Sequence, residues 1–156
     1  VLFGNTQAAS PPDQYKLYGD VLELLKSMGC REVVTLGGLK RERPPTLPEV
    51  HCTATSREAL RRAVNLGARI IRGRIFGAAG LLPGLAKLKG MKGLCALVDT
   101  LGVYPDAQAA QVALKFLGDY LGFSPNVEGI EETAEQVKDF LNVGLGGKKR
   151  GWDIIL

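Results

Sequence analysis

The sequence predicts an α/β fold with a mainly parallel sheet and helices on both of its faces. Short apolar runs of the kind that form buried strands alternate along the chain with longer segments whose apolar residues recur at helical spacing. A strand, a helix and a further strand in succession favour parallel pairing of the two strands. Of the 156 residues, 46% are hydrophobic and 23% charged, so the chain is large enough to bury the core that such a fold requires.

The chain up to Gly67 is expected to supply three strands and two helices. The strands are expected at 1–3, 32–36 and 50–55, and the first helix at 13–28. Gly37-Gly38 is expected to end the second strand, and the charged, proline-rich residues 40–48 to form a loop. Thr55 and Glu58 have the spacing of a capping box, which predicts that the second helix starts there and ends at Gly67.

The rest of the chain is expected to continue the alternation. Apolar and basic residues alternate over 69–76, which predicts a strand that has one solvent-exposed face or that lies at an edge of the sheet. Gly77 to Gly80 lead into residues 81–89, which are apolar almost all round and therefore predict a buried helix. A buried strand is expected at 93–98, a helix from Pro105-Asp106, and a last helical face over 127–141 that starts at Ser124-Pro125-Asn126.

The charge of the chain is modestly basic, with a formal net charge of +4 and a pI near 9.1. The largest basic cluster consists of arginines between Arg57 and Arg74. We interpret it as a solvated surface, because a dedicated nucleic-acid binder carries a denser basic charge. Nucleic-acid binding is therefore disfavoured, although phosphate attraction by these arginines stays open as an alternative.

The cysteine count and the hydropathy exclude several classes of protein. Cys30, Cys52 and Cys95 form no C-x-x-C pattern, which argues against a disulfide scaffold and a structural zinc site and favours a reducing, cytoplasmic setting. There is no run of about 18 apolar residues, so no membrane span is expected. We predict no metal and no cofactor.

Residue types that support nucleophilic catalysis are scarce. His51 is the only histidine and is followed by Cys52. Adjacent residues of a strand point to opposite faces, so these two side chains are not expected to form a catalytic pair. The G-x-S-x-G elbow is also missing. We therefore predict no catalytic residue.

Two glycine pairs are candidate anion-binding positions. Gly37 and Gly38 follow a strand, and Gly77 and Gly80 open a helix, where backbone N–H groups and the helix dipole attract anions. Neither pair matches the dinucleotide or P-loop pattern. The alternative is that these glycines form tight turns and permit close packing of a helix on a strand.

Asp99 and Asp106 form a candidate polar site. Asp99 follows a buried strand and Asp106 precedes a helix, and open α/β sheets bind ligands at the carboxyl ends of their strands. The alternative for Asp106 is that it caps its helix.

The end of the chain is a candidate docking tail. It has an apolar group, Trp152, Ile154, Ile155 and Leu156, behind a basic and glycine-containing segment. Either this tail folds back on its own domain, or it docks on a neighbouring subunit or another partner.

Motifs between Gly77 and Ala110 resemble those of a known family. The stretch reads Gly77-Ala78-Ala79-Gly80-Leu81-Leu82-Pro83-Gly84, then Gly90, an apolar strand to Val98, and Tyr104-Pro105-Asp106 before Ala109-Ala110. It is similar to the G-x-x-G-L-L … G … Y-x-D-x-x-A-A core of the proteasome assembly chaperone family, type two, with its archaeal relatives once labelled ATP-grasp-like. Val34 to Gly38 resembles the strand and Gly-Gly turn of that family, and the acidic helix from Glu131 to Leu141 fits as well.

This resemblance implies a three-layer fold similar to nucleoside phosphorylases, without established catalysis. It implies homo-oligomers and, in some members, binding to proteasome α-subunits. The family fold has further strands ahead of the position where this chain begins, so we expect its N-terminal part to be missing here. Residues 1–143 are then one α/β domain and 144–156 a tail. Members that dock on the proteasome can end in a hydrophobic residue, a tyrosine and any residue, and the tail here lacks the tyrosine.

The expected function is a protein-binding factor that acts as an oligomer in the assembly or regulation of a protein complex. The alternative is a nucleotide- or phosphate-dependent enzyme of phosphorylase or ligase type, which would use the glycine motifs as its phosphate site.

Overall fold

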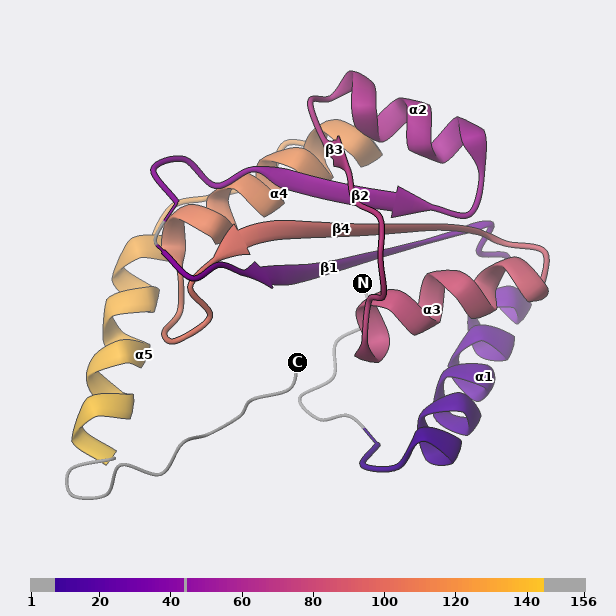
Figure 1. Ribbon diagram of the computed structural model, residues 1–156, viewed down its shortest axis with the longest axis horizontal. Helices are drawn as coiled ribbons and strands as arrows, with labels where there is room; N and C mark the ends of the chain where they lie inside the picture. The colour runs from indigo at the N-terminus through magenta and orange to yellow at the C-terminus, as the bar shows by residue number, and fades with distance from the viewer. Residues whose placement is uncertain (1–7, 44, 145–156) are drawn as a thin grey trace.

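The computed structural model describes residues 8–43 and 45–144, and the tail residues Trp152 to Leu156 lie outside this part. Figure 1 shows one sheet with helices packed around it. The helices are α1 (Pro11–Ser27), α2 (Arg57–Asn65), α3 (Gly77–Leu88), α4 (Ala107–Leu121) and α5 (Ile130–Gly144). The strands are β1 (Glu32–Lys40), β2 (Val50–Ala54), β3 (Arg69–Ile70) and β4 (Lys92–Thr100). None of the helices among the described residues is long and apolar enough to cross a membrane.

The sheet has the strand order β1-β4-β2-β3 and is mostly parallel. β1 pairs with β4 in parallel, and so does β2 with β3, whereas β2 and β4 are antiparallel. The central strand β4 is buried almost throughout, as a strand flanked on both sides is expected to be. The predicted α/β class and mainly parallel sheet are confirmed.

Alternating residues of β4 point to opposite faces of the sheet, and helices cover both. Leu94 and Ala96 belong to a core cluster with Phe116 and Tyr120 of α4 and Ala63 of α2. On the other face, Gly93 meets Pro83 of α3, whose Ala86 packs with Leu22 of α1. The two faces of one strand therefore organise two separate cores.

The prediction that Gly37-Gly38 ends a strand is wrong. β1 continues to Lys40, because its parallel pairing with β4 extends to Thr100. A Cβ at Gly37 would lie 3.0 Å from Leu97 Cδ2, and one at Gly38 would lie 2.7 Å from Thr100 Cγ2. The two glycines make room for side chains of the neighbouring strand, which is a packing role and not a turn.

The predicted cap of α2 is also wrong. Ser56, not Thr55, caps α2, with its Oγ accepting from the Ala59 amide at 3.1 Å. Thr55 Oγ1 instead accepts from the Gly93 amide at 2.8 Å, so it is held by the sheet.

The strand expected at 69–76 is shorter than predicted. It comprises only Arg69–Ile70, which are exposed and pair at the edge of the sheet. The pairing ends after the Ile71 amide donates to the Cys52 carbonyl.

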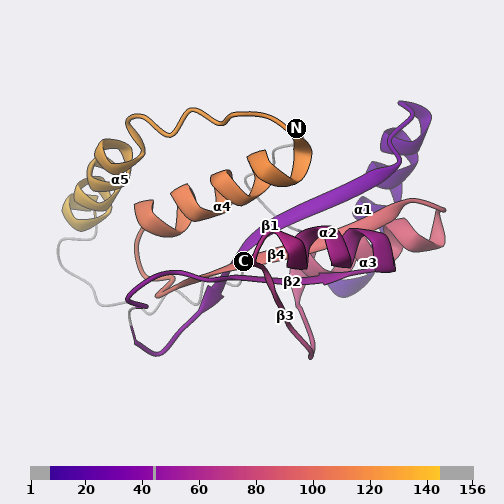
Figure 2. The same ribbon diagram turned by 90° about the horizontal axis from the view of Figure 1, so that it is seen from above.

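The last helices differ from expectation in their surroundings. α3 begins at Gly77 and contacts the sheet and α1, but its Leu88 is 81% exposed, so it is not buried all round. α5 begins at Ile130 and not near Asn126, because Asn126 Oδ1 accepts from the Glu128 amide and Gly129 then turns the chain with φ +75°. Seen from above, the connection runs back along α4 and brings α5 beside the start of that helix (Figure 2).

Candidate functional site

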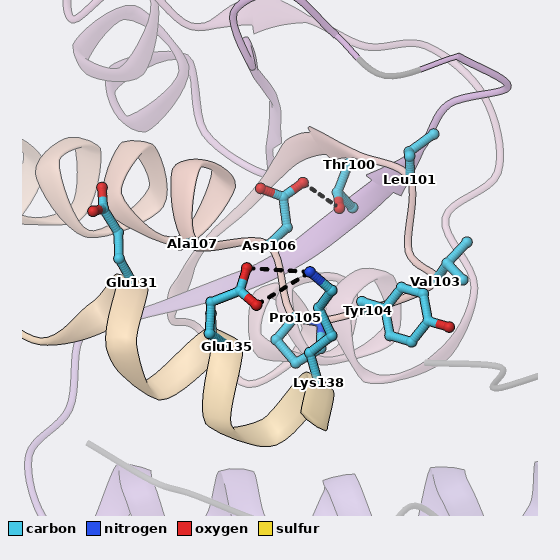
Figure 3. A pocket seen from close by; sticks show the side chains of 11 residues that line it. Thr100, Leu101, Val103, Tyr104, Pro105, Asp106, Ala107, Glu131, Glu135 and Lys138 are labelled. Atoms are coloured by element: carbon cyan, nitrogen blue, oxygen red, sulfur yellow. Dashed lines mark hydrogen bonds and ion pairs between the residues drawn. The ribbon is translucent and has the colours of Figure 1, made fainter. Parts of the chain in front are cut away.

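One hollow of the described surface lies where β4 ends and α4 begins. Asp106 caps α4, since its Oδ1 accepts from the Ala109 amide at 3.0 Å, and this confirms the capping interpretation. Its Oδ2 accepts from the Thr100 hydroxyl at 2.8 Å, as drawn in Figure 3. The Gly102 amide donates to the same hydroxyl at 3.2 Å. These bonds fix the loop between β4 and α4.

Two adjoining cavities of about 530 and 280 Å³ lie between this loop, the first turns of α4 and α5. Both are lined by Pro105, Asp106, Ala107 and Ala134, so they form one depression, named here the α4–α5 groove. Its floor is mainly apolar. The apolar lining residues are Leu101, Val103, Pro105, Ala107, Ala110, Ile130, Ala134 and Val137.

The rim of the α4–α5 groove is acidic. Glu131 accepts from Gln111 Nε2 at 3.2 Å, and Lys138 pairs with Glu135 at 3.1 Å (Figure 3). Glu128 lines the smaller cavity. Lys138 is the only cation among the lining residues, and it is engaged by Glu135. The groove therefore favours a ligand that combines apolar groups with positive charge.

Asp99 does not line the groove but belongs to a separate ionic cluster. Its Oδ1 lies 2.6 Å from Nε of Arg41 and 3.0 Å from Nε2 of His51. Its Oδ2 accepts from the Glu49 amide at 3.3 Å. Burial raises the pKa of the Asp99 carboxyl, but the hydrogen bonds from Arg41, His51 and the Glu49 amide outweigh burial and hold that pKa below its ordinary value.

Glu49, His51 and Asp99 have the spacing of metal ligands, with one ligand atom each and all three atoms within 4.8 Å of one another. However, the Arg41 guanidinium lies beside two of these residues. Its Nη2 lies 2.9 Å from His51 Nε2, and its Nε lies 2.6 Å from Asp99 Oδ1. The cation in this cluster is therefore Arg41 itself. Both carboxylate oxygens of Asp99 are engaged, so the cluster is suited to holding the segment between β1 and β2 onto β4.

The structure separates the predicted site residues from one another. Asp106 lies in the groove, and Asp99 lies in the ionic cluster. His51 faces Asp99, whereas Cys52 packs in the core with Leu94 on the opposite face, as expected for neighbours in a strand. Burial raises the pKa of the Cys52 thiol, and the nearby Cys95 adds to this, so Cys52 is held in its unreactive form.

The glycine positions pack closely against their neighbours. A Cβ at Gly80 would lie 2.3 Å from the Ile75 carbonyl oxygen, and Gly77 adopts φ +68° at the start of α3. Gly37 and Gly38 lie within β1, away from any turn. Anion binding at these four glycines stays a prediction.

Sequence reasoning missed the groove residues on α5 and the role of Arg41. Glu131, Glu135 and Lys138 recur at helical spacing, so a search for one charged face on the last helix would have grouped them. Arg41 carries no such signal, because its partner Asp99 is 58 residues away and meets it only through strand pairing.

Comparison with known proteins identifies relatives. The chain is 32% identical over 143 residues to the uncharacterized protein MJ1210 of Methanocaldococcus jannaschii, covering 90% of this chain and 55% of the relative. Among solved structures, Pyrococcus furiosus PbaB, an archaeal proteasome activator, matches with a TM-score of 0.74 and 29% identity, over 90% of this chain and 62% of that one. P. furiosus PbaA, an archaeal homolog of proteasome-assembly chaperone, matches with a TM-score of 0.79 and 26% identity, over 88% and 63%.

The chain thus spans somewhat more than half the length of the relatives that it matches. The model of the PAC2 family matches residues 1–143, which is most of the sequence. The family resemblance read from the glycine and Tyr104–Asp106 motifs is confirmed, and the chain belongs to the PAC2 family.

Proposed function

We propose that the chain is a protein-binding factor that assists the assembly or the regulation of a proteasome complex. The observation that carries this proposal is the match of residues 1–143 to the PAC2 family, together with the likeness to PbaB and PbaA. Homo-oligomerisation is part of the proposal, because the resemblance to proteasome assembly chaperones implies it.

The α4–α5 groove supports a protein partner over a phosphate-bearing substrate. Asp106, Glu131 and Glu135 line the larger cavity, and negative charges in a shared depression disfavour phosphate groups. The apolar floor instead suits the side chains of a polypeptide, with basic residues at the acidic rim.

The test is to mix the full chain with archaeal proteasome α-subunits and to weigh the products by native mass spectrometry. We expect an oligomer of the chain alone and a further complex that contains α-subunits. PbaB, added in place of the chain, is the positive control. A monomer that leaves the α-subunits unbound, under conditions in which PbaB associates, contradicts the proposal.

A non-catalytic role is the second part of the proposal, and ligand-induced stabilisation tests it. A ligand that binds the folded state at a hundredfold excess over its dissociation constant adds about 2.7 kcal/mol of stability. We expect the melting temperature to stay unchanged with ATP, AMP and inorganic phosphate. A rise with any of the three would favour the phosphorylase or ligase alternative.

We also infer that the complete domain is a three-layer, phosphorylase-like fold. The helices on both faces of β4 support this inference, as does the presence of PAC2 relatives whose own chains are longer. A crystal structure of the protein tests it. Additional strands beside β1 are expected, and a sheet that ends at β1 would contradict it.

A further inference from the structure

The α4–α5 groove has a complementary surface on the same chain, on the exposed face of α2. We propose that the groove of one copy binds α2 of a second copy, with carboxylates of the groove facing arginines of α2, and that this contact builds the homo-oligomer. The inference rests on the homo-oligomerisation included in the proposed function, and it names the two surfaces that meet.

Two carboxylates of the groove have no cation beside them in the described part of the chain. Glu131, which lines the larger cavity, accepts from the neutral amide of Gln111. Glu128 lines the smaller cavity, and its side chain forms no hydrogen bond or ion pair with a described residue. Lys138 is already paired with Glu135. The groove therefore presents two uncompensated negative charges beside an apolar floor, which favours a cationic partner.

The exposed face of α2 carries the opposite pattern. Arg57 and Arg61 are exposed, and neither side chain forms an ion pair or a hydrogen bond with the residues that the structure describes. They lie one helical turn apart, and Val64, which is 40% exposed, continues the same face. Glu58, the one acidic residue of this helix, is engaged by Lys92 at 2.6 Å. The face is therefore a basic stripe that ends in an apolar side chain.

The other described helices offer no such stripe. α1, α3 and α4 each have a single lysine outside an ion pair, and the cation in the described part of α5 is Lys138, which Glu135 holds. Two cations one turn apart can face two carboxylates of the groove at once, whereas a lone lysine can face one. The spacing of the charges thus favours α2 as the occupant.

The two surfaces lie too far apart to meet within one molecule. The groove adjoins the first turns of α4, whereas Arg62 of α2 lies 3.7 Å from the centre of the Tyr120 ring, in the last turn of that helix. From Ala107 to Tyr120 the helix covers about 20 Å at ~1.5 Å per residue. Figures 1 and 2 both show α2 apart from α5. The contact therefore requires two copies, and a heterologous contact of this kind generates a ring when its rotation closes.

Apolar side chains beside the charges supply the burial that an interface needs. Val103 and Tyr104 line the larger cavity and are exposed. Leu66 and Ile70, which follow α2 in the chain, are exposed as well. Covering these side chains removes apolar surface from water, while the charges fix the register of the contact.

Charge reversal on each surface tests the contact. The groove variant is Glu128→Lys with Glu131→Lys, and the α2 variant is Arg57→Glu with Arg61→Glu. In native mass spectrometry we expect the wild-type chain to be an oligomer, and each variant alone to be a monomer at the same concentration, because like charges then face each other. Mixed in equal amounts, the two variants should form assemblies that contain both, since the reversed groove of one then meets the reversed α2 of the other.

The matched control reverses two exposed carboxylates of α1, Asp20→Lys with Glu23→Lys, and should keep the oligomer. The inference is overturned by variants that stay oligomeric, by a control that dissociates, or by a mixture of folded variants that stays monomeric. If circular dichroism shows that a reversal prevents folding, Glu131→Gln and Arg61→Gln take its place. Each should raise the dissociation constant of the oligomer severalfold, and an unchanged constant also overturns the inference.

The result is separate from that of proteasome binding. A monomeric wild type contradicts the proposed homo-oligomerisation together with this inference, whereas an oligomer that survives both reversals contradicts this inference alone. Reassembly of the mixed variants without any binding of α-subunits contradicts the proposed proteasome role alone.

Discussion

The Arg41 guanidinium lies 2.6 Å from the Asp99 carboxylate and joins the residue that follows β1 to the central strand β4. The Arg41 amide also donates to the Thr100 carbonyl at 2.8 Å, so both the backbone and the side chain of Arg41 are bound to β4. The side chain of Arg41 is 42% exposed and that of Asp99 only 6%. The charge of Asp99 therefore depends more on the ion pair for its stabilisation than the charge of Arg41 does. Without Arg41 and His51, Asp99 would be a buried charge with only a backbone amide as its partner.

The first prediction concerns the removal of this charge. Asp99→Asn keeps the shape of the side chain but loses the charge-assisted hydrogen bonds, so we expect the free energy of unfolding to fall by about 1–3 kcal/mol. Urea denaturation at pH 7 measures it. Glu42→Gln, on an exposed residue of the same segment, is the control and should change stability by less than about 0.5 kcal/mol. Equal effects of the two substitutions would show that the cluster adds nothing.

The second prediction is the pH dependence of the same contribution. The pKa of Asp99 is lower in the folded chain than in the unfolded chain, so the unfolded state binds a proton first as pH falls. The stabilisation is therefore complete above the unfolded pKa of about 3.9 and is lost as pH falls through the lower, folded pKa. The difference in urea midpoint between wild type and Asp99→Asn should shrink from pH 6 to pH 3. A difference that stays constant over this range would mean that the charge of Asp99 does not contribute.

Features that depend on neighbouring residues are predictable from the sequence, whereas those that depend on strand pairing are not. The helix cap at Asp106 is predictable because the amide that it binds belongs to Ala109, three residues on. Gly37-Gly38 suggests a turn because glycine is a local signal for turns, but the place of these residues in β1 depends on Leu97 and Thr100. Such long-range contacts appear only when the strand order is known.

The groove is partly predictable for the same reason. Local patterns are enough to place a site at the carboxyl end of β4 and the start of α4. They do not give the position of α5 beside α4, because it is set by the connection after Gly122, where the left-handed φ of +80° ends α4 and redirects the chain. The place of the acidic residues of α5 beside the start of α4 is therefore visible only in the fold.

The third prediction separates the two roles of glycine within α3. Gly80→Ala would bring its Cβ to 2.3 Å from the Ile75 carbonyl oxygen, so we expect a loss of about 1–3 kcal/mol of stability from overpacking. A Cβ at Gly84 of the same helix would meet nothing within 4 Å, and Gly84→Ala should raise stability by up to about 1 kcal/mol. Thermal unfolding of both variants measures the contrast. Gly80→Ala as stable as wild type would contradict the close packing of α3.

The fourth prediction concerns the contact between α4 and the start of β1. The Tyr120 hydroxyl donates to Glu32 Oε1 at 2.6 Å, and Arg62 lies 3.7 Å above the centre of the Tyr120 ring. Tyr120→Phe keeps the ring and the cation–π contact but loses the hydrogen bond, so we expect a loss of about 1–2 kcal/mol in urea denaturation. Tyr15→Phe, on a residue that is 56% exposed, is the matched control and should be nearly neutral. The interpretation fails if both substitutions cost the same.

The last prediction is the order in which the three cysteines react. Cys52 and Cys95 are buried, and burial raises the pKa of both thiols, which lowers the fraction of reactive thiolate. Cys30 is partly exposed after the end of α1. We therefore expect one thiol per folded chain to react rapidly with a disulfide reagent such as dithionitrobenzoate, and all three to react in urea. Cys30→Ser should abolish the rapid phase. If a rapid phase persists in that variant, one of the two core cysteines is accessible, and the packing of β2 and β4 against the helices is looser than described.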